Sequence, residues 1–242
     1  MMDIISTEGI IFRTLKYAET SIICDIFTKE RGLKSYIVSG VRKSGKNASG
    51  TLYQVGNIVM ITAYDGTDDK LQRIKEIHLA HHYQQIGIHV IKSSIILFMM
   101  EVCRNTIKEK EENVVLFNFI KNYLLYVDEV GKPPSCVLHL YMIELSYMLG
   151  FGPSVDDFNE GLRFDLLNGE FSHDFTSHYL LSAAESAALY KIIGSDISNI
   201  DQIQIKNQMR VELLDHLMMY FRLHVPTFTE SQAIRVIRQV FA

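Results

Sequence analysis

The change of hydrophobic period near residue 80 limits this chain to two successive kinds of structure. Residues 7–78 alternate apolar and polar side chains in short runs separated by turns, which is typical of β-strands. After His78 the apolar residues recur at helical spacing. A chain of 242 residues has ample length for one large or two modest domains. We therefore expect two domains, residues 1–79 and 80–242.

Five strands are expected in the first domain. They cover residues 10–13, 22–27, 33–39, 55–63 and 71–77. Between the second and third, Gly32 ends a turn and can adopt positive φ. Five strands without a helix predict a small closed barrel. The OB-fold is the leading candidate, because it has five strands and holds oligonucleotides with its face and loops.

Helices are expected in the second domain. They cover residues 84–104, 111–130, 135–149, 182–193, 204–225 and 229–240. Capping boxes begin the helices at Ser182 and Thr229. The dipeptide Asn168-Gly169 predicts a small β-hairpin within residues 150–175. The predicted fold class is α+β: an N-terminal OB-fold barrel followed by an all-α helical domain with a hairpin insertion.

Positive charge gathers in the first domain. Residues 1–78 hold 11 Lys and Arg against 9 Asp and Glu, a net +2, and the remaining 13 and 19 give −6. Six cations and one anion occur between Lys29 and Lys46. The stretch Gly32–Gly50 begins as a strand and becomes a glycine-rich cationic loop. Such a loop beside a strand that carries an aromatic residue suits the binding of a nucleic-acid backbone.

Catalytic and metal-binding motifs are weak in this sequence. Residues 40–46 match the phosphate-loop pattern GxxxxGK, but Asn47 replaces the Ser or Thr that contacts magnesium. The adjacent carboxylates and the histidine pairs lack the partners that two-metal or zinc chemistry requires. The three cysteines are far apart, and we interpret them as buried free thiols. We expect no enzymatic activity, no cofactor and no metal.

No signal-peptide pattern or bilayer-spanning apolar run is present in the sequence, so we expect a cytoplasmic protein without a membrane partner.

The order of four motifs resembles the bacterial DNA repair and recombination protein RecO family. The motifs are Thr-Glu-Gly-Ile-Ile-Phe-Arg-Thr from Thr7, Tyr-Ala-Glu-Thr-Ser-Ile-Ile from Tyr17, Ile-Phe-Thr-Lys-Glu-Arg-Gly-Leu from Ile26, and Val-Ser-Gly-Val-Arg-Lys from Val38. Residues 220–224, Tyr-Phe-Arg-Leu-His, are similar to the closing region of the family. Each motif alone is unspecific, and their order and spacing carry the resemblance.

The resemblance implies a non-enzymatic protein that binds single- and double-stranded DNA and anneals complementary strands. It also implies two partners: RecR, and single-strand-binding protein, whose acidic-aromatic C-terminal tail docks on the helical domain, so that recombinase is loaded onto coated DNA. Many family members carry a four-cysteine zinc module where this chain has the cysteine-free segment 150–175, and we predict no zinc. The residue before Gly40, often Lys in the family, is Ser39, which weakens one expected phosphate contact.

Six residues are predicted to bind nucleic acid. The loop cations would neutralise phosphates, two strand cations would extend that track across one surface of the barrel, and one aromatic ring would stack a base. In that order they are Arg42, Lys43 and Lys46, then Arg13 and Lys34, then Tyr36. The alternative function is a protein-interaction scaffold, favoured by the acidity of residues 79–242, or an OB-fold that binds RNA rather than DNA.

Overall fold

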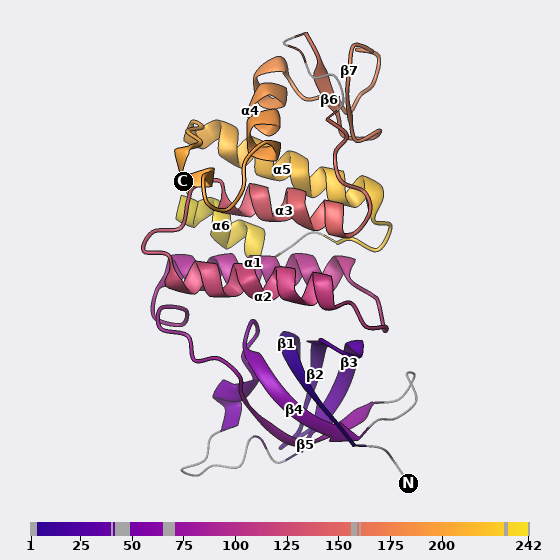
Figure 1. The fold of residues 1–242 in the computed structure, drawn as a ribbon, viewed down its shortest axis with the longest axis vertical. Coiled ribbons are helices and arrows are strands. Elements are labelled where there is room, and N and C mark those ends of the chain that lie inside the picture. Colours follow the sequence, from indigo (N-terminus) through magenta and orange to yellow (C-terminus); the bar gives the residue numbers. More distant parts are fainter. Residues whose placement is uncertain are drawn as a thin grey trace. The chain divides into compact units, whose positions relative to one another are not determined.

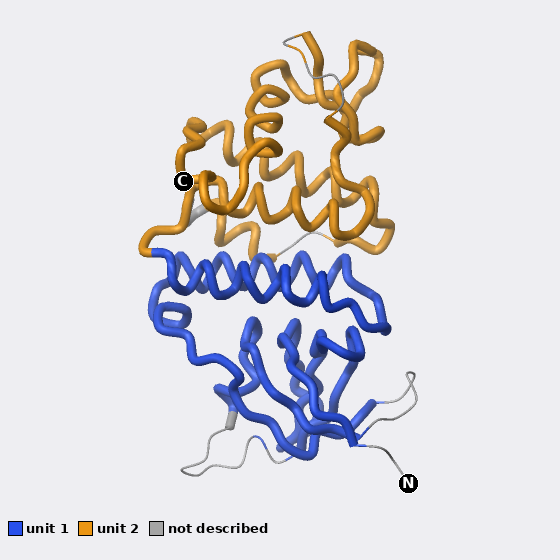
Figure 2. The backbone as a smooth tube through the Cα atoms, in the orientation of Figure 1, with its two compact units in different colours: residues 1–130 blue, residues 131–242 orange. Residues whose placement is uncertain are grey.

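The computed structural model describes residues 4–39, 41, 49–64, 71–155, 159, 161–229 and 232–241. The chain forms two compact units, residues 1–130 and 131–242 (Figure 2). The first unit contains the barrel together with two helices, whereas the expected boundary at residues 79 and 80 marks the change from strands to helices. Within the described ranges, no helix combines the length and hydropathy of a membrane span.

Five strands close into a barrel, as the sequence predicts. They are β1 (Ile4–Lys16), β2 (Ile22–Thr28), β3 (Gly32–Val38), β4 (Ile58–Tyr64) and β5 (Gln72–Leu79), with a 3-10 helix η1 (Ser49–Tyr53) before β4. Their order around the barrel is β1-β2-β3-β5-β4, and only β3 and β5 are parallel (Figure 1). β1 is longer than predicted because its first part pairs with β4 and its second part with β2.

A bulge in β1 decides which side chains face the solvent. The interior is apolar and includes the fully buried Ile11, Cys24 and Tyr36. The register shifts between Ile11 and Arg13, so the alternation of the strand reverses there. Arg13 consequently faces outward, opposite Asp25 of β2, instead of entering the core.

Two helices, α1 (Val90–Thr106) and α2 (Val114–Glu129), lie side by side across one end of the barrel (Figure 1). A Cβ added to Gly56 would lie 2.4 Å from the side chain of Ile96, so α1 approaches the barrel closely. The rings of Phe27 and Phe117 lie 6.1 Å apart. These contacts explain why the first two helices form one unit with the barrel.

α1 begins at Val90, later than predicted, because Gly87 has a φ of +93° and the N-cap residue His89 is extended. Asp128 accepts hydrogen bonds from the amides of Gln84, Gln85 and Ile86 at 2.8, 2.8 and 2.9 Å. Burial disfavours the charged carboxylate, but the three amide donors outweigh it and lower the pKa of Asp128. Asp128 of α2 therefore holds the turn that precedes α1.

The second unit contains four helices and a hairpin within its described residues. They are α3 (Val137–Met148), the strands β6 (Arg163–Asp165) and β7 (Glu170–Ser172), α4 (Ala183–Ile193), a 3-10 turn η2 (Ile200–Gln202), α5 (Asn207–His224) and α6 (Ala233–Phe241). The predicted hairpin is confirmed, with Gly169 at φ +71° in its turn. The capping box of Ser182 and Glu185 is confirmed as well. The second predicted capping box includes residues 230 and 231, which lie outside the described residues.

Aromatic packing joins the hairpin to α5. Phe164 of β6 lies 5.0 Å from Phe171 of β7 and 5.8 Å from Tyr220 of α5, measured between ring centroids. The hydroxyl of Tyr220 donates to the carbonyl of Phe151, and Phe151 packs edge-on against Phe221 at 5.1 Å. This segment, expected to replace a zinc module, is thus held by an aromatic cluster. The three cysteines are buried and free, as predicted.

Candidate nucleic-acid interface

The outer wall of the barrel carries a polar row across three strands. Asp25 of β2 accepts a hydrogen bond from Arg13 of β1 at 2.6 Å and from the hydroxyl of Ser35 on β3 at 2.6 Å. The side chain of Arg13 is 37% exposed and that of Asp25 only 10%. The guanidinium group is therefore accessible to a ligand while its partner carboxylate is covered.

An apolar row lies beside the polar one. The register pairs Leu15 with Ile23, Ile23 with Ile37, and Ile37 with Arg73. Leu15 is 43% exposed, and the two isoleucines are half-buried. Tyr17, which follows Leu15 by two residues, is 59% exposed. A cationic surface that also exposes apolar and aromatic side chains can bind both the phosphates and the bases of a single strand.

A groove of about 350 Å³ runs between β3 and β5. Arg73 and Lys75 contribute two cations to its lining and Glu76 one anion. Ser39 and Tyr53 also line it, and they stand at the two ends of the segment that carries the predicted cationic loop. The amide of Val41 donates to the carbonyl of Thr20 at 3.0 Å, which ties the start of that segment to the turn between β1 and β2.

The structure places the predicted binding residues in three different settings. Arg13 lies on the outer wall, but Lys34 and Tyr36 point to the inner side of β3 and are 7% and 0% exposed. Arg13 and Lys34 therefore do not form one continuous track, and the ring of Tyr36 fills the barrel core instead of offering a face for stacking. The three loop cations, Arg42, Lys43 and Lys46, lie outside the described residues.

Sequence reasoning missed the exposed apolar row because it had no way to choose between the two faces of β3. Side chains on β3 alternate between two faces, and the sequence pattern allows either face to point outward. The face with Lys34 and Tyr36 carries the residue types expected of a nucleic-acid surface. In the structure the ring of Tyr36 fills the core, which leaves Ile37 on the outside. The bulge in β1 gives Leu15 the same orientation, and no sequence signal marks that bulge.

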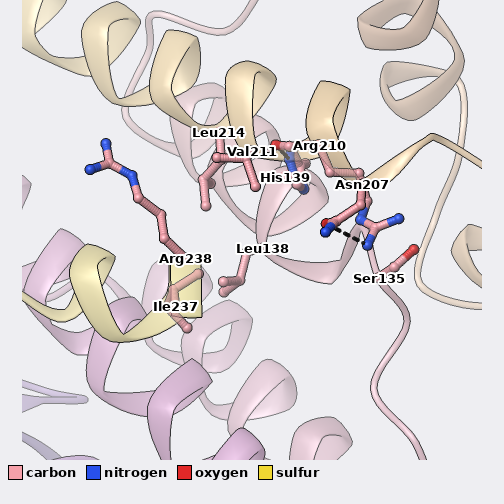
Figure 3. A pocket seen from close by; sticks show the side chains of 9 residues that line it. All are labelled: Ser135, Leu138, His139, Asn207, Arg210, Val211, Leu214, Ile237 and Arg238. Carbon is pink, nitrogen blue, oxygen red and sulfur yellow. Dashed lines mark hydrogen bonds between the residues drawn. The ribbon is translucent and has the colours of Figure 1, made fainter. Parts of the chain in front are cut away.

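The second unit offers a small apolar pocket and a larger groove. The pocket, about 20 Å³, is lined by residues of α3, α5 and α6 (Figure 3). Its buried His139 hydrogen-bonds the carbonyl of Arg210 through Nε2 at 2.8 Å, and the Arg210 guanidinium donates to Asn207 at 3.0 Å. This volume holds about one water molecule and no side chain of a partner.

The larger groove, about 190 Å³, lies between α5 and α6. Met218, Met219 and Ile234 provide its apolar lining. Arg238 pairs with Asp215 at 2.5 Å, and Arg222 is exposed and makes no ion pair with any described residue. The groove thus combines adaptable apolar side chains with an available cation. In the part of the chain that the structure describes, no three His, Cys, Asp or Glu side chains gather as metal ligands.

Two family models match the chain in succession. The model described as "Recombination protein O N terminal" matches residues 2–83, and "Recombination protein O C terminal" matches residues 90–232. Curated relatives named DNA repair protein RecO align over nearly their whole length. The protein of Christiangramia forsetii is 28% identical over 98% of this chain and 99% of its own, and that of Phocaeicola vulgatus is 30% identical over 98% of both. The chain therefore belongs to the RecO family of DNA-binding repair and recombination proteins, which act as non-enzymatic recombination mediators.

Proposed function

We propose that this protein binds DNA through the outer wall of its barrel and anneals complementary strands during recombinational repair. It acts with RecR and single-strand-binding protein to load recombinase onto coated DNA. The observation that carries the proposal is the outer wall itself, where Arg13 and Arg73 flank the exposed apolar row of Leu15, Ile23 and Ile37. Bases contact the apolar row, and the cations neutralise phosphates.

Annealing follows from this chemistry without a catalytic group. Two complementary strands repel each other through their phosphates, and a cationic surface lowers that repulsion. The contacts are independent of sequence, because the backbone supplies the charge and every base presents an apolar face. The strands can therefore search for their pairing while they remain bound.

The cationic loop provides the test of this interface. We expect the variant R42A/K43A/K46A to bind all DNA sequences more weakly and to lower the slope of log affinity against log salt by about 2, since each phosphate contact on a single strand contributes about 0.7. Fluorescence anisotropy with mixed-sequence oligonucleotides measures both quantities. The control K132A/K191A/K206A removes the same charge from exposed positions in the second unit.

Unchanged binding by the loop variant would remove the loop from the interface. A wild-type protein that fails to bind DNA at low salt, yet forms a salt-insensitive complex with a protein partner, would instead select the scaffold function. Competition between matched DNA and RNA strands separates a DNA-binding from an RNA-binding barrel.

We place the tail of single-strand-binding protein in the groove between α5 and α6. An acidic-aromatic tail needs a cation for its carboxylates and an adaptable apolar surface for its ring. Arg222 meets the first need, and the side chains of Met218 and Met219 meet the second. Four of the eight cations in residues 131–242 lie on α5 and α6, so this acidic unit is locally positive where the tail docks.

A further inference from the structure

The end of α1 brings two more cations to the outer wall of the barrel. The segment that follows α1 binds the start of β3, because the amide of Leu33 donates to the carbonyl of Glu109 at 2.8 Å. Gly32 lies against the same segment: an added Cβ would approach the carbonyl oxygens of Glu109 and Glu111 within 2.7 and 2.4 Å. Lys108, which directly precedes Glu109, is therefore held near the start of β3.

Three cations, Arg13, Arg104 and Lys108, outnumber the single carboxylate of Asp25. The ammonium group of Lys108 donates to the carbonyl of Arg104 at 2.7 Å. Arg13 is paired with Asp25, whereas neither Arg104 nor Lys108 pairs with a carboxylate of any described residue. The neighbouring Glu109 carboxylate accepts a hydrogen bond from Asn113 instead. The cluster of Arg13, Arg104, Lys108 and Asp25 carries a net charge of +2.

The neighbouring charges act on the pKa of the Lys108 ammonium group. Desolvation lowers the pKa of Lys108, and the charges of Arg104 and Arg13 lower it further, against a smaller opposing effect of Asp25. Arg104, Arg13 and Asp25 thus all lie within electrostatic range of the Lys108 ammonium group. The partial negative charge at the C-terminus of α1 offsets only part of the excess positive charge. An added anion would relieve the remaining repulsion between the cations.

We propose that Arg104, Lys108 and Arg13 form a phosphate-binding site that extends the DNA interface from the barrel onto the end of α1. This inference rests on the proposed function. Its ligand is the phosphodiester backbone, which a strand lying along Leu15, Ile23 and Ile37 would present beside that row, on the side of Arg13. Asp25 competes with the backbone for Arg13, so it limits the affinity of the surface.

Two variants test the site. R104Q/K108Q removes both charges and keeps much of the apolar stems, and we expect it to lower the salt slope for an oligothymidine by about 1.4 and the affinity at least about tenfold. D25N releases Arg13 from its competitor, and we expect it to raise the affinity about threefold. Anisotropy titrations at several salt concentrations measure both effects, and melting temperatures establish that each variant is folded.

The matched control is K132A/K191A, which removes two exposed charges from the second unit. An unchanged slope for R104Q/K108Q, or weaker binding by folded D25N, would overturn the inference. If the variant R42A/K43A/K46A loses affinity while R104Q/K108Q does not, only the site at α1 fails. If the wild-type protein does not bind DNA, the proposed function itself fails.

Discussion

His139 is a histidine that the fold keeps uncharged. It is 3% exposed, and its Nε2 donates to the carbonyl of Arg210 at 2.8 Å. Desolvation lowers its pKa from the ordinary 6.5 to about 4, and the nearby Arg210 charge acts in the same direction. Because the unfolded chain takes up this proton at higher pH than the folded one, acid favours unfolding. The stabilising effect is complete above pH 6.5 and is lost as the pH falls toward 4.

We expect the free energy of unfolding to decrease by about 3 kcal/mol from this residue across that window. The variant H139Q keeps a donor for the Arg210 carbonyl but cannot be protonated, so it should show a smaller difference in stability between pH 7 and pH 5. Urea unfolding at both pH values measures the difference. The control H82Q alters an exposed histidine and should retain the wild-type pH dependence. Equal pH dependence of H139Q and wild type would contradict the assignment.

At the scale of elements, the β6–β7 hairpin depends on aromatic burial. Phe164 is fully buried between Phe171 and Tyr220. We expect F164A to lower the free energy of unfolding by about 3–5 kcal/mol, as large cavities in aromatic cores do. The control F175A removes a ring that is 53% exposed and lies under Arg163, and it should lower the free energy of unfolding by about 1 kcal/mol or less.

Urea unfolding measures both variants. Repeating the wild-type measurement with a chelator tests the hairpin further, because a loss of stability in the chelator would reveal that a metal holds the hairpin instead.

The elements were more predictable from the sequence than the surfaces they form. Asn168-Gly169 and the capping box at Ser182 mark their structures locally, since a few neighbouring residues determine each one. The choice of inner and outer face on β3 depends on which ring fills the barrel, and the position of Arg13 depends on a bulge. Lys108 contributes its charge to this surface because the segment after α1 packs against the start of β3, which is distant in the sequence. Long-range packing of this kind leaves no periodic signal.

At the scale of the whole molecule, charge divides the chain between its two units. Residues 1–130 hold 16 cations and 15 anions, a net +1, and residues 131–242 hold 8 and 13, a net −5. A polyanion favours the first unit, and the outer wall of the barrel lies there. In the second unit four of the eight cations, including Arg222 of the groove, lie on α5 and α6. We therefore expect DNA binding and tail binding to be separable by mutation.

The double variant R222A/M219A should separate them. It removes a cation and an apolar side chain from the groove between α5 and α6. We expect it to anneal bare complementary strands at the wild-type rate but to anneal strands coated with single-strand-binding protein about tenfold more slowly, a loss equivalent to about 1.4 kcal/mol of docking energy. The variant R42A/K43A/K46A should be slower on both substrates, because it weakens the contact with DNA itself. The control K191A/M148A removes one cation and one methionine side chain from exposed positions of this unit. Slower annealing of bare strands by R222A/M219A would place the groove in the DNA interface, and an unchanged rate on coated strands would exclude it as the docking site of the tail.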